Sequence, residues 1–257
     1  MIQLESAGLT NAGKVRGKNE DACMVDNENQ YYLVADGIGG HLSGEVASGI
    51  VVDTFKDCLK NTTADDFSRI DDDLCKEGKK LMVLIHKANE LVYKRSKEDK
   101  NCRGMGSTVS AVCFSDSTLV SANVGDSPVY LIRNNEAELI SFIHNVESDR
   151  SSIDFESIKA FDPKVLKMLS RAIGAAEDVS PDAREIPCFA GDRVVICSDG
   201  LSNLVDSREI AEKVTYNIPE DACHILVDLA NERGGMDNIT VIVIEIKSVE
   251  TTGAMVF

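Results

Sequence analysis

Four aspartates lie at the ends of stretches whose composition is typical of buried strands. They are Asp36 after the run 31–35, Asp126 after 119–124, Asp199 after 194–198, and Asp237 before the run 239–246. One Asp beside a Gly is common in turns and needs no special explanation. Four acids at strand ends instead indicate a site at which several carboxylates converge.

Converging carboxylates suggest a particular chemistry. Two of them about 4 Å apart repel by about 4 kcal/mol at an effective dielectric constant near 20, so they must protonate, separate or bind a cation. Oxygen ligands without Cys or His favour Mg²⁺ or Mn²⁺ over zinc. Two such ions can lower the pKa of a water from about 15.7 toward about 7 and hold a phosphoryl oxygen. No nucleophilic side chain is then required.

Arg16 and the glycines after Asp36 complete this hypothetical site. A guanidinium presents a fork of donors that suits a phosphate group. An ion pair of Arg16 with Glu20 or Asp21 is the alternative interpretation. The glycines allow the backbone to approach a metal, so the carbonyl of Gly37 is a candidate ligand, although a tight strand-to-helix turn also explains them.

Composition limits the function classes and the setting. The 257 residues carry a formal charge of −16, which disfavours nucleic acid and anionic membranes as partners. No apolar run reaches about 18 residues, and the N-terminus lacks a signal-peptide pattern. The eight cysteines form no Cys-x-x-Cys pair, which favours reduced thiols. We therefore expect a cytoplasmic monomer.

The sequence contains neither the Gly-x-Ser-x-Gly motif of serine hydrolases nor the His-Glu-x-x-His motif of zinc proteases, so it offers no support for these two catalytic classes.

Hydrophobic periodicity predicts an α+β fold. The order of strands and helices does not alternate strictly, which disfavours a parallel sheet and favours antiparallel sheets covered by helices. No linker or repeat interrupts the chain, so we expect one domain over 1–257, with an irregular excursion over 138–169 that contains a short helix after Pro163. The expected strands are 4–9, 22–25, 31–35, 107–114, 118–124, 128–133, 184–186, 193–198 and 239–246, and the expected helices are 44–59, 74–95, 207–214 and 219–232.

Taken together in order, these residues resemble the metal-dependent protein phosphatase family of the PP2C type, and its bacterial branch most. The motifs are Arg16-x-x-Asn19-Glu20-Asp21, Ala35-Asp36-Gly37-x-Gly39-Gly40-His41, Gly106-Ser107-Thr108, Gly125-Asp126-Ser127, Ser170-Arg171-Ala172-Ile173-Gly174, Ser198-Asp199-Gly200-Leu201 and Asp237-Asn238-Ile239-Thr240. The resemblance implies a four-layer αββα sandwich of two antiparallel sheets flanked by helix pairs. It also implies hydrolysis of phosphoserine and phosphothreonine in proteins by a water or hydroxide that bridges two metal ions.

The resemblance implies a role for each motif residue, with two to three Mn²⁺ or Mg²⁺ ions as cofactors. Asp36 and Asp199 are the expected catalytic acids. Asp36 would bridge two ions, with Asp199 and Asp237 on one and the Gly37 carbonyl on the other, while Asp126 would serve a third site and Glu20 and Asp21 would hold metal-bound waters. Arg16 would bind the substrate phosphate, and Ser107 and Thr108 are expected to be structural. Phosphorylated proteins of a cognate Ser/Thr kinase are the expected partners.

Two departures from the family pattern affect this interpretation. Ile38 stands where eukaryotic members carry a histidine proposed as general acid. The 141–169 segment, in the place of a mobile flap, also departs from the usual bacterial sequence. A pseudophosphatase that acts as a binding or regulatory module is the alternative, and its signature would be a missing core acid. A phosphatase of an anti-sigma-antagonist system would keep the same chemistry with another substrate.

Overall fold

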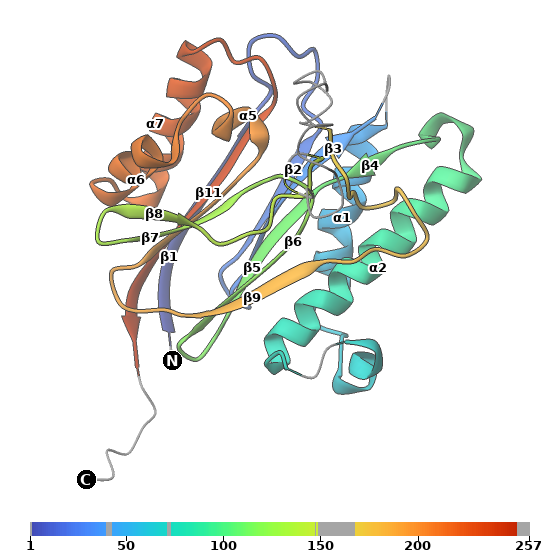
Figure 1. Cartoon of the computed structure of the whole chain (residues 1–257), viewed down its shortest axis with the longest axis horizontal. Coiled ribbons are helices and arrows are strands. Elements are labelled where there is room, and N and C mark those ends of the chain that lie inside the picture. Colours follow the sequence, from blue (N-terminus) through green and yellow to red (C-terminus); the bar gives the residue numbers. More distant parts are fainter. Residues whose placement is uncertain (1, 40–42, 71–72, 147, 149–167, 251–257) are drawn as a thin grey trace, which may run out of the picture.

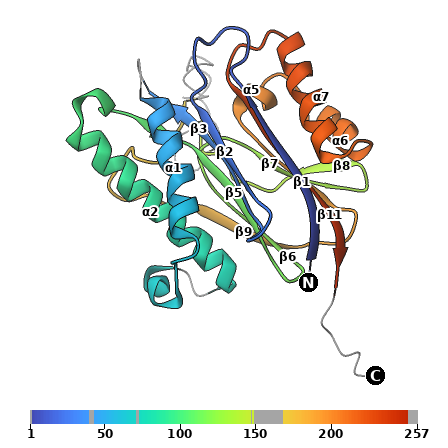
Figure 2. The ribbon, with the colours of Figure 1, turned by 180° about the vertical axis from the view of Figure 1, so that it is seen from behind.

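Two antiparallel sheets lie face to face between two sets of helices (Figure 1). The first sheet has the strand order β1-β11-β10-β7-β8 and the second has β2-β3-β5-β6-β9, with the short β4 paired to β3. The view from behind shows the same arrangement, with α1 and α2 on one side and α6 and α7 on the other (Figure 2). The computed structural model describes residues 2–39, 43–70, 73–146, 148 and 168–250.

The first sheet contains the first and the last strand of the chain, β1 and β11. These two long strands pair antiparallel, with Thr10 opposite Thr240. The short edge strand β8 pairs only with β7. The strands are β1 (Ile2–Asn11), β7 (Val129–Arg133), β8 (Glu136–Leu139), β10 (Arg193–Cys197) and β11 (Ile239–Val249).

The second sheet is built from the middle of the chain and from β9. Strand β3, which lies between β2 and β5, is buried along most of its length because both of its faces are covered. The strands are β2 (Asp21–Asp26), β3 (Tyr31–Ile38), β4 (Gly106–Ser107), β5 (Val109–Ser115), β6 (Thr118–Val124) and β9 (Asp182–Pro187).

Amphipathic helices cover the outer face of each sheet. Helices α1 (Gly44–Cys58) and α2 (Lys76–Glu98) pack on the second sheet, and α6 (Ser207–Thr215) and α7 (Pro219–Glu232) pack on the first. The remaining helical elements are α5 (Asp199–Ser202), η1 (Ala64–Arg69) and η2 (Lys100–Cys102). None of the helices in the described part of the chain combines the length and apolar character needed to cross a bilayer.

Three apolar layers hold the sandwich together. One lies between the second sheet and α1 with α2, around Phe55 and Leu84. Another lies between the first sheet and α6 with α7, around Leu226. The third lies between the two sheets and includes Val34 and Ile196. Burial of apolar area is the main favourable term in folding, so these layers fix the relative position of the sheets.

The predicted α+β class and the four-layer sandwich are confirmed. Strand β8 was not predicted, because Glu136–Leu139 is a mostly exposed edge strand of four residues, too short for its alternation of Glu with Ala and Leu to stand out. The predicted strand 107–114 is interrupted at Thr108, which separates β4 from β5. The predicted helix after Pro163, and Gly40 and His41 of the glycine motif, lie outside the described residues.

Candidate active site

The four predicted aspartates meet where strand ends of the two sheets adjoin. Asp36 lies near the end of β3 and Asp126 follows β6, whereas Asp199 opens α5 after β10 and Asp237 precedes β11. Together with Arg16 they line one cavity of about 280 Å³, hereafter the carboxylate cavity. Glu20, Gly37, Ile38, Gly39, Thr108, Leu169 and Asn238 complete its described lining.

Hydrogen bonds from the β4–β5 junction hold the backbone at Asp36. Its amide donates to the hydroxyl of Thr108 at 3.0 Å, and the amide of Thr108 donates to its carbonyl at 2.8 Å. The hydroxyl of Ser107 also donates to that carbonyl at 3.1 Å. Ser107 and Thr108 thus act structurally, as expected: their hydrogen bonds hold the backbone of Asp36 in place.

Asp21 lies behind the carboxylate cavity and is opposite Asp36 in the pairing of β2 with β3. Its Oδ2 accepts hydrogen bonds from the hydroxyls of Ser198 at 2.8 Å and Thr240 at 2.7 Å. Its Oδ1 is buried without a hydrogen-bond partner among the described residues. Burial raises the pKa of Asp21 to about 6, against the lowering effect of the two hydroxyls.

The acids in and behind the cavity disfavour one another's ionised forms. Burial raises the pKa of Asp36 well above its usual range, and repulsion from Asp21, Asp199, Asp126 and Asp237 adds to the shift. Burial and repulsion from Asp237 also raise the pKa of Asp199, although hydrogen bonds with Asp36 and Asn203 oppose the change. Such a cluster is stabilised by positive charge.

Arg16 supplies positive charge at the mouth of the carboxylate cavity. Its guanidinium donates to Asp237 Oδ2 at 2.7 Å, and the two side chains are 51% and 37% exposed. This hydrogen bond raises the pKa of Arg16. The sequence offered Glu20 or Asp21 as the alternative partner of Arg16, and the structure pairs it with Asp237.

A second set of contacts fixes Glu20 and Gly37. The Glu20 amide donates to Asn238 Oδ1 at 2.8 Å, and the Glu20 carbonyl accepts from the amide of Gly37 at 3.2 Å and from the Ser48 hydroxyl at 2.6 Å. A Cβ at Gly37 would clash with the carbonyl oxygens of Glu20 and Gly44. Only glycine fits this close approach, which leaves the Gly37 peptide in the cavity wall.

Several supporting residues had no role assigned from the sequence. The only sequence signal for three of them was their place in the family motifs; these are Ser198, Asn238 and Thr240. His144 gave no signal, because its partners are distant in sequence. Its buried ring accepts from the Gly125 amide at 3.1 Å and lies 2.8 Å from an oxygen of Asp182, so it supports the turn that carries Asp126.

The donor set of the cavity fits hard divalent cations. No three Asp, Glu, His or Cys side chains in the described ranges lie close enough together to hold one ion as they stand. One of the acids, Asp237, is instead paired with Arg16. The described lining nevertheless supplies five carboxylates and backbone carbonyls and neither Cys nor His, and behind it the Oδ1 of Asp21 is buried without a partner; this oxygen-rich donor set suits Mg²⁺ and Mn²⁺.

Comparison with known proteins agrees with this geometry. Residues 11–239 match the family model described as protein phosphatase 2C. A serine/threonine phosphatase stp of Listeria welshimeri is 32% identical over 243 residues, which are 92% of this chain and 93% of the relative. The crystal structure of the Mycobacterium tuberculosis serine/threonine phosphatase PstP/Ppp superposes with a TM-score of 0.80 at 28% identity and covers 96% of this chain and 100% of its own.

A related solved structure holds metal. The catalytic domain of the serine/threonine protein phosphatase PstP, in complex with two manganese ions, is 27% identical with a TM-score of 0.80, and covers 96% of this chain and 100% of its own. The fold and the carboxylate cavity define a metal-dependent phosphoric monoester hydrolase. The chain belongs to the protein phosphatase 2C family and is a serine/threonine phosphatase.

Proposed function

We propose that the carboxylate cavity binds Mn²⁺ or Mg²⁺ ions and hydrolyses phosphoserine and phosphothreonine esters of proteins. The observation that carries this proposal is the convergence of Asp36, Asp126, Asp199 and Asp237 with Arg16 on one small cavity. Every core acid is present, so the signature of a pseudophosphatase is missing from this chain.

Each residue has a role that its position supports. Asp36 is the acid on which the charges of Asp21, Asp199, Asp126 and Asp237 all act, so it would be the ligand shared by two ions. Asp199, Asp237 and the Gly37 carbonyl would complete these two sites, and Asp126 would serve a third. When bound, the ions supply a water of lowered pKa and polarise the phosphoryl group.

The second group of residues acts around these ligands. Glu20 lines the cavity and Asp21 lies behind it, which suits both for accepting hydrogen bonds from waters on the ions. Arg16, at the mouth and half exposed, would orient the substrate phosphate through its planar fork of donors. The chain itself therefore binds and orients the ester and compensates for charge, without a nucleophilic side chain.

The setting of the enzyme is part of the proposal. We propose phosphoproteins of a cognate Ser/Thr kinase as substrates, a monomeric enzyme in the cytoplasm, and no nucleic acid or membrane partner. The charge of −16 supports the last point. All eight cysteines are free thiols, which suits a reducing compartment. Comparing the phosphoproteome of a deletion strain with that of its parent would identify the substrates.

Asp36→Asn and Asp199→Asn test the assignment of the site. Each removes one negative charge from the cavity without a change in side-chain size, so turnover of a phosphothreonine peptide should fall by on the order of 10³-fold. Circular dichroism should report an intact fold in both. Asp228→Asn, at an exposed position on α7, is the matched control and should keep full activity. Unchanged turnover in either cavity variant would refute the assignment.

A further inference from the structure

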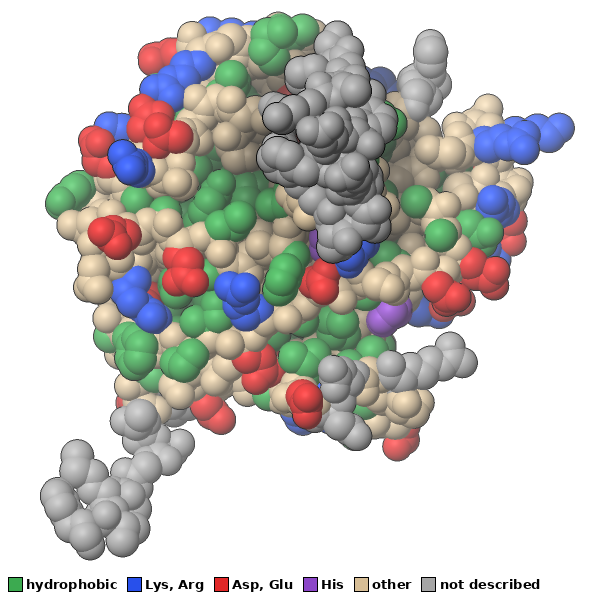
Figure 3. Space-filling model, in the orientation of Figure 1, with side chains coloured by type: hydrophobic (Ala, Val, Ile, Leu, Met, Phe, Trp, Pro, Cys, Tyr) green, Lys and Arg blue, Asp and Glu red, His purple; other side chains and the backbone are tan. Residues whose placement is uncertain are grey.

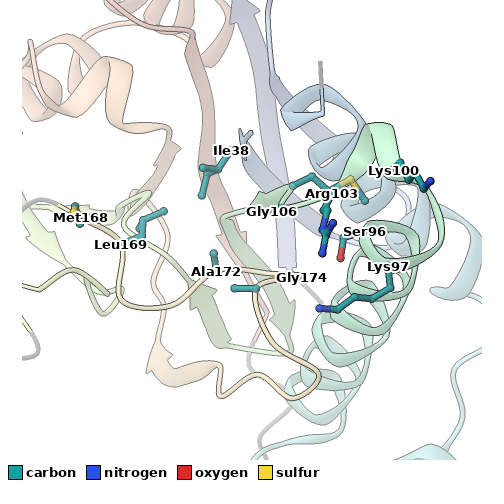
Figure 4. Close-up of a pocket in the computed structure, with 13 residues that line it drawn as sticks. Ile38, Ser96, Lys97, Lys100, Arg103, Gly106, Met168, Leu169, Ala172 and Gly174 are labelled. Atoms are coloured by element: carbon teal, nitrogen blue, oxygen red, sulfur yellow. The ribbon is translucent and has the colours of Figure 1, made fainter. Parts of the chain in front are cut away.

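A larger cavity of about 800 Å³ adjoins the carboxylate cavity. The two share Ile38 and Leu169 in their walls, so they are neighbours that meet at these two side chains. In Figure 4, Met168 and Leu169 lie on one side and Ile38 and Ala172 in the middle, which makes this part of the cavity apolar. The opposite side is formed by the end of α2 and by η2.

Three cations line that opposite side. Lys97, Lys100 and Arg103 are all exposed, and none of them forms an ion pair with an acid in the described part of the chain. Lys97 lies with its ammonium 4.7 Å from the ring centroid of Tyr93. On the same helix end, by contrast, Lys94 pairs with Glu98 and Arg95 pairs with Asp99. We call the cavity with these three cations the basic groove.

The charge of the basic groove is opposite to that of the molecule. The chain has 43 acidic and 27 basic residues, so its mean field repels acidic ligands. Figure 3 shows Lys and Arg side chains on the edge of the molecule where α2 ends, with Asp and Glu side chains close by. Cations without an acidic partner among the described residues, beside an active site, therefore mark a region where a negatively charged segment is attracted.

We propose that the basic groove binds Asp and Glu side chains that flank the phosphorylated residue of the substrate protein, an inference that rests on the proposed function. An extended peptide advances about 3.3 Å per residue, so the neighbours of a phosphoresidue held at Arg16 reach past Ile38 into the groove. Its apolar floor accommodates the peptide backbone and side-chain stems. The charged groups of Lys97 and Arg103 lie toward the cavity and face the carboxylates, and Lys100 adds charge at the outer edge (Figure 4). The enzyme thus selects acidic sequence contexts.

The test compares two phosphothreonine peptides that differ only in having Glu or Gln at the flanking positions. Exposed ion pairs are individually weak, so three together should give the Glu peptide an advantage in kcat/KM of about tenfold. The triple variant Lys97→Gln, Lys100→Gln, Arg103→Gln should lose this advantage, mainly through KM. Higher salt should reduce the advantage in the unmodified enzyme.

Two controls separate this inference from the proposed function. The variant Lys56→Gln, Lys76→Gln, Arg208→Gln removes the same charge from exposed helix positions outside both cavities and should keep the preference. Turnover of an aryl phosphate, too small to reach the groove, should be equal in all three proteins. Fluorescence anisotropy of a labelled Glu peptide in chelator reports binding without turnover, and the groove variant should bind it about tenfold more weakly.

The outcomes are distinguishable. No turnover of the aryl phosphate by the unmodified enzyme with Mn²⁺ would count against the proposed function, and the anisotropy comparison would still decide on the groove. Equal kcat/KM for both peptides in the unmodified enzyme, or an undiminished Glu preference in the groove variant, would overturn the inference.

Discussion

Ile38 restricts how a proton reaches the leaving group. Its side chain is 37% exposed and lines the carboxylate cavity, but it has no ionisable group. Among the described residues that line this cavity there is no histidine. Protonation of the leaving serine or threonine oxygen must therefore come from water or from one of the carboxyl groups that line the cavity. The same side chain joins the cavity to the basic groove, so Ile38 bears on substrate fit as well as on chemistry.

Arg16→Ala is the sharpest residue-scale test of substrate binding. The guanidinium, whose Nη2 donates to Asp237 Oδ2 at 2.7 Å, lines the carboxylate cavity. Its removal should lower kcat/KM for a phosphopeptide by about 10–100-fold, mostly through KM. Arg16→Lys should recover only part of the loss, because an ammonium lacks the fork. Steady-state kinetics with both variants measures this, and an unaltered KM in Arg16→Ala would rule out the role.

At the scale of elements, the turn between β6 and β7 depends on a buried histidine. The Gly125 amide donates to His144 Nδ1, so Nε2 carries the proton and donates to Asp182. Arg171 donates to the same Asp182 oxygen at 2.7 Å. Gly125 has φ +112, a conformation that favours glycine. Three side chains distant in sequence, those of His144, Arg171 and Asp182, thus support the turn that carries Asp126.

His144→Ala should therefore damage both stability and metal response. It leaves the buried Gly125 amide without its side-chain acceptor, which costs about 1–3 kcal/mol, while Asp182 keeps its ion pair with Arg171. Thermal unfolding should show the lower Tm, and the Mn²⁺ concentration for half-maximal activity should rise. His224→Ala, at an exposed site on α7, is the control. Identical Tm values for the two variants would contradict the structural role of His144.

For the whole molecule, the sequence predicted the sheets, the main helices and the four strand-end acids, because these depend on local periodicity and turn chemistry. It did not predict the pairing of Arg16 with Asp237 or the place of Asp21 behind the cavity. Both depend on how β2 and β11 are brought together from opposite ends of the chain. The basic groove was missed for the same reason, since its walls come from three separate segments.

The acid cluster makes the stability of the metal-free protein depend on pH. Folding raises the pKa of Asp21 from 3.8 to about 6 and also raises that of Asp36, so the folded state binds these protons more tightly than the unfolded state. Stability is therefore gained as pH falls through this range and lost as pH rises. In chelator, Tm should be higher near about pH 5 than near about pH 7.5.

Saturating Mn²⁺ should reduce this pH dependence, because bound cations favour the ionised acids and stabilise the folded state. Asp21→Asn should flatten the metal-free profile, whereas Asp228→Asn should leave it unchanged. Differential scanning calorimetry at several pH values provides the comparison. A metal-free Tm that rises from acidic to neutral pH would contradict the assignment of raised pKa values to this cluster.

The most direct test of the metal-dependent phosphatase is turnover of a phosphothreonine peptide by one sample before chelation, after chelation and after addition of Mn²⁺. The carboxylate cavity requires cations to bring its acids together, so phosphate release should fall to background after chelation and return with Mn²⁺. The Asp36→Asn protein should remain inactive throughout. Sustained phosphate release in chelator, or Mn²⁺-stimulated release by Asp36→Asn, would contradict the account.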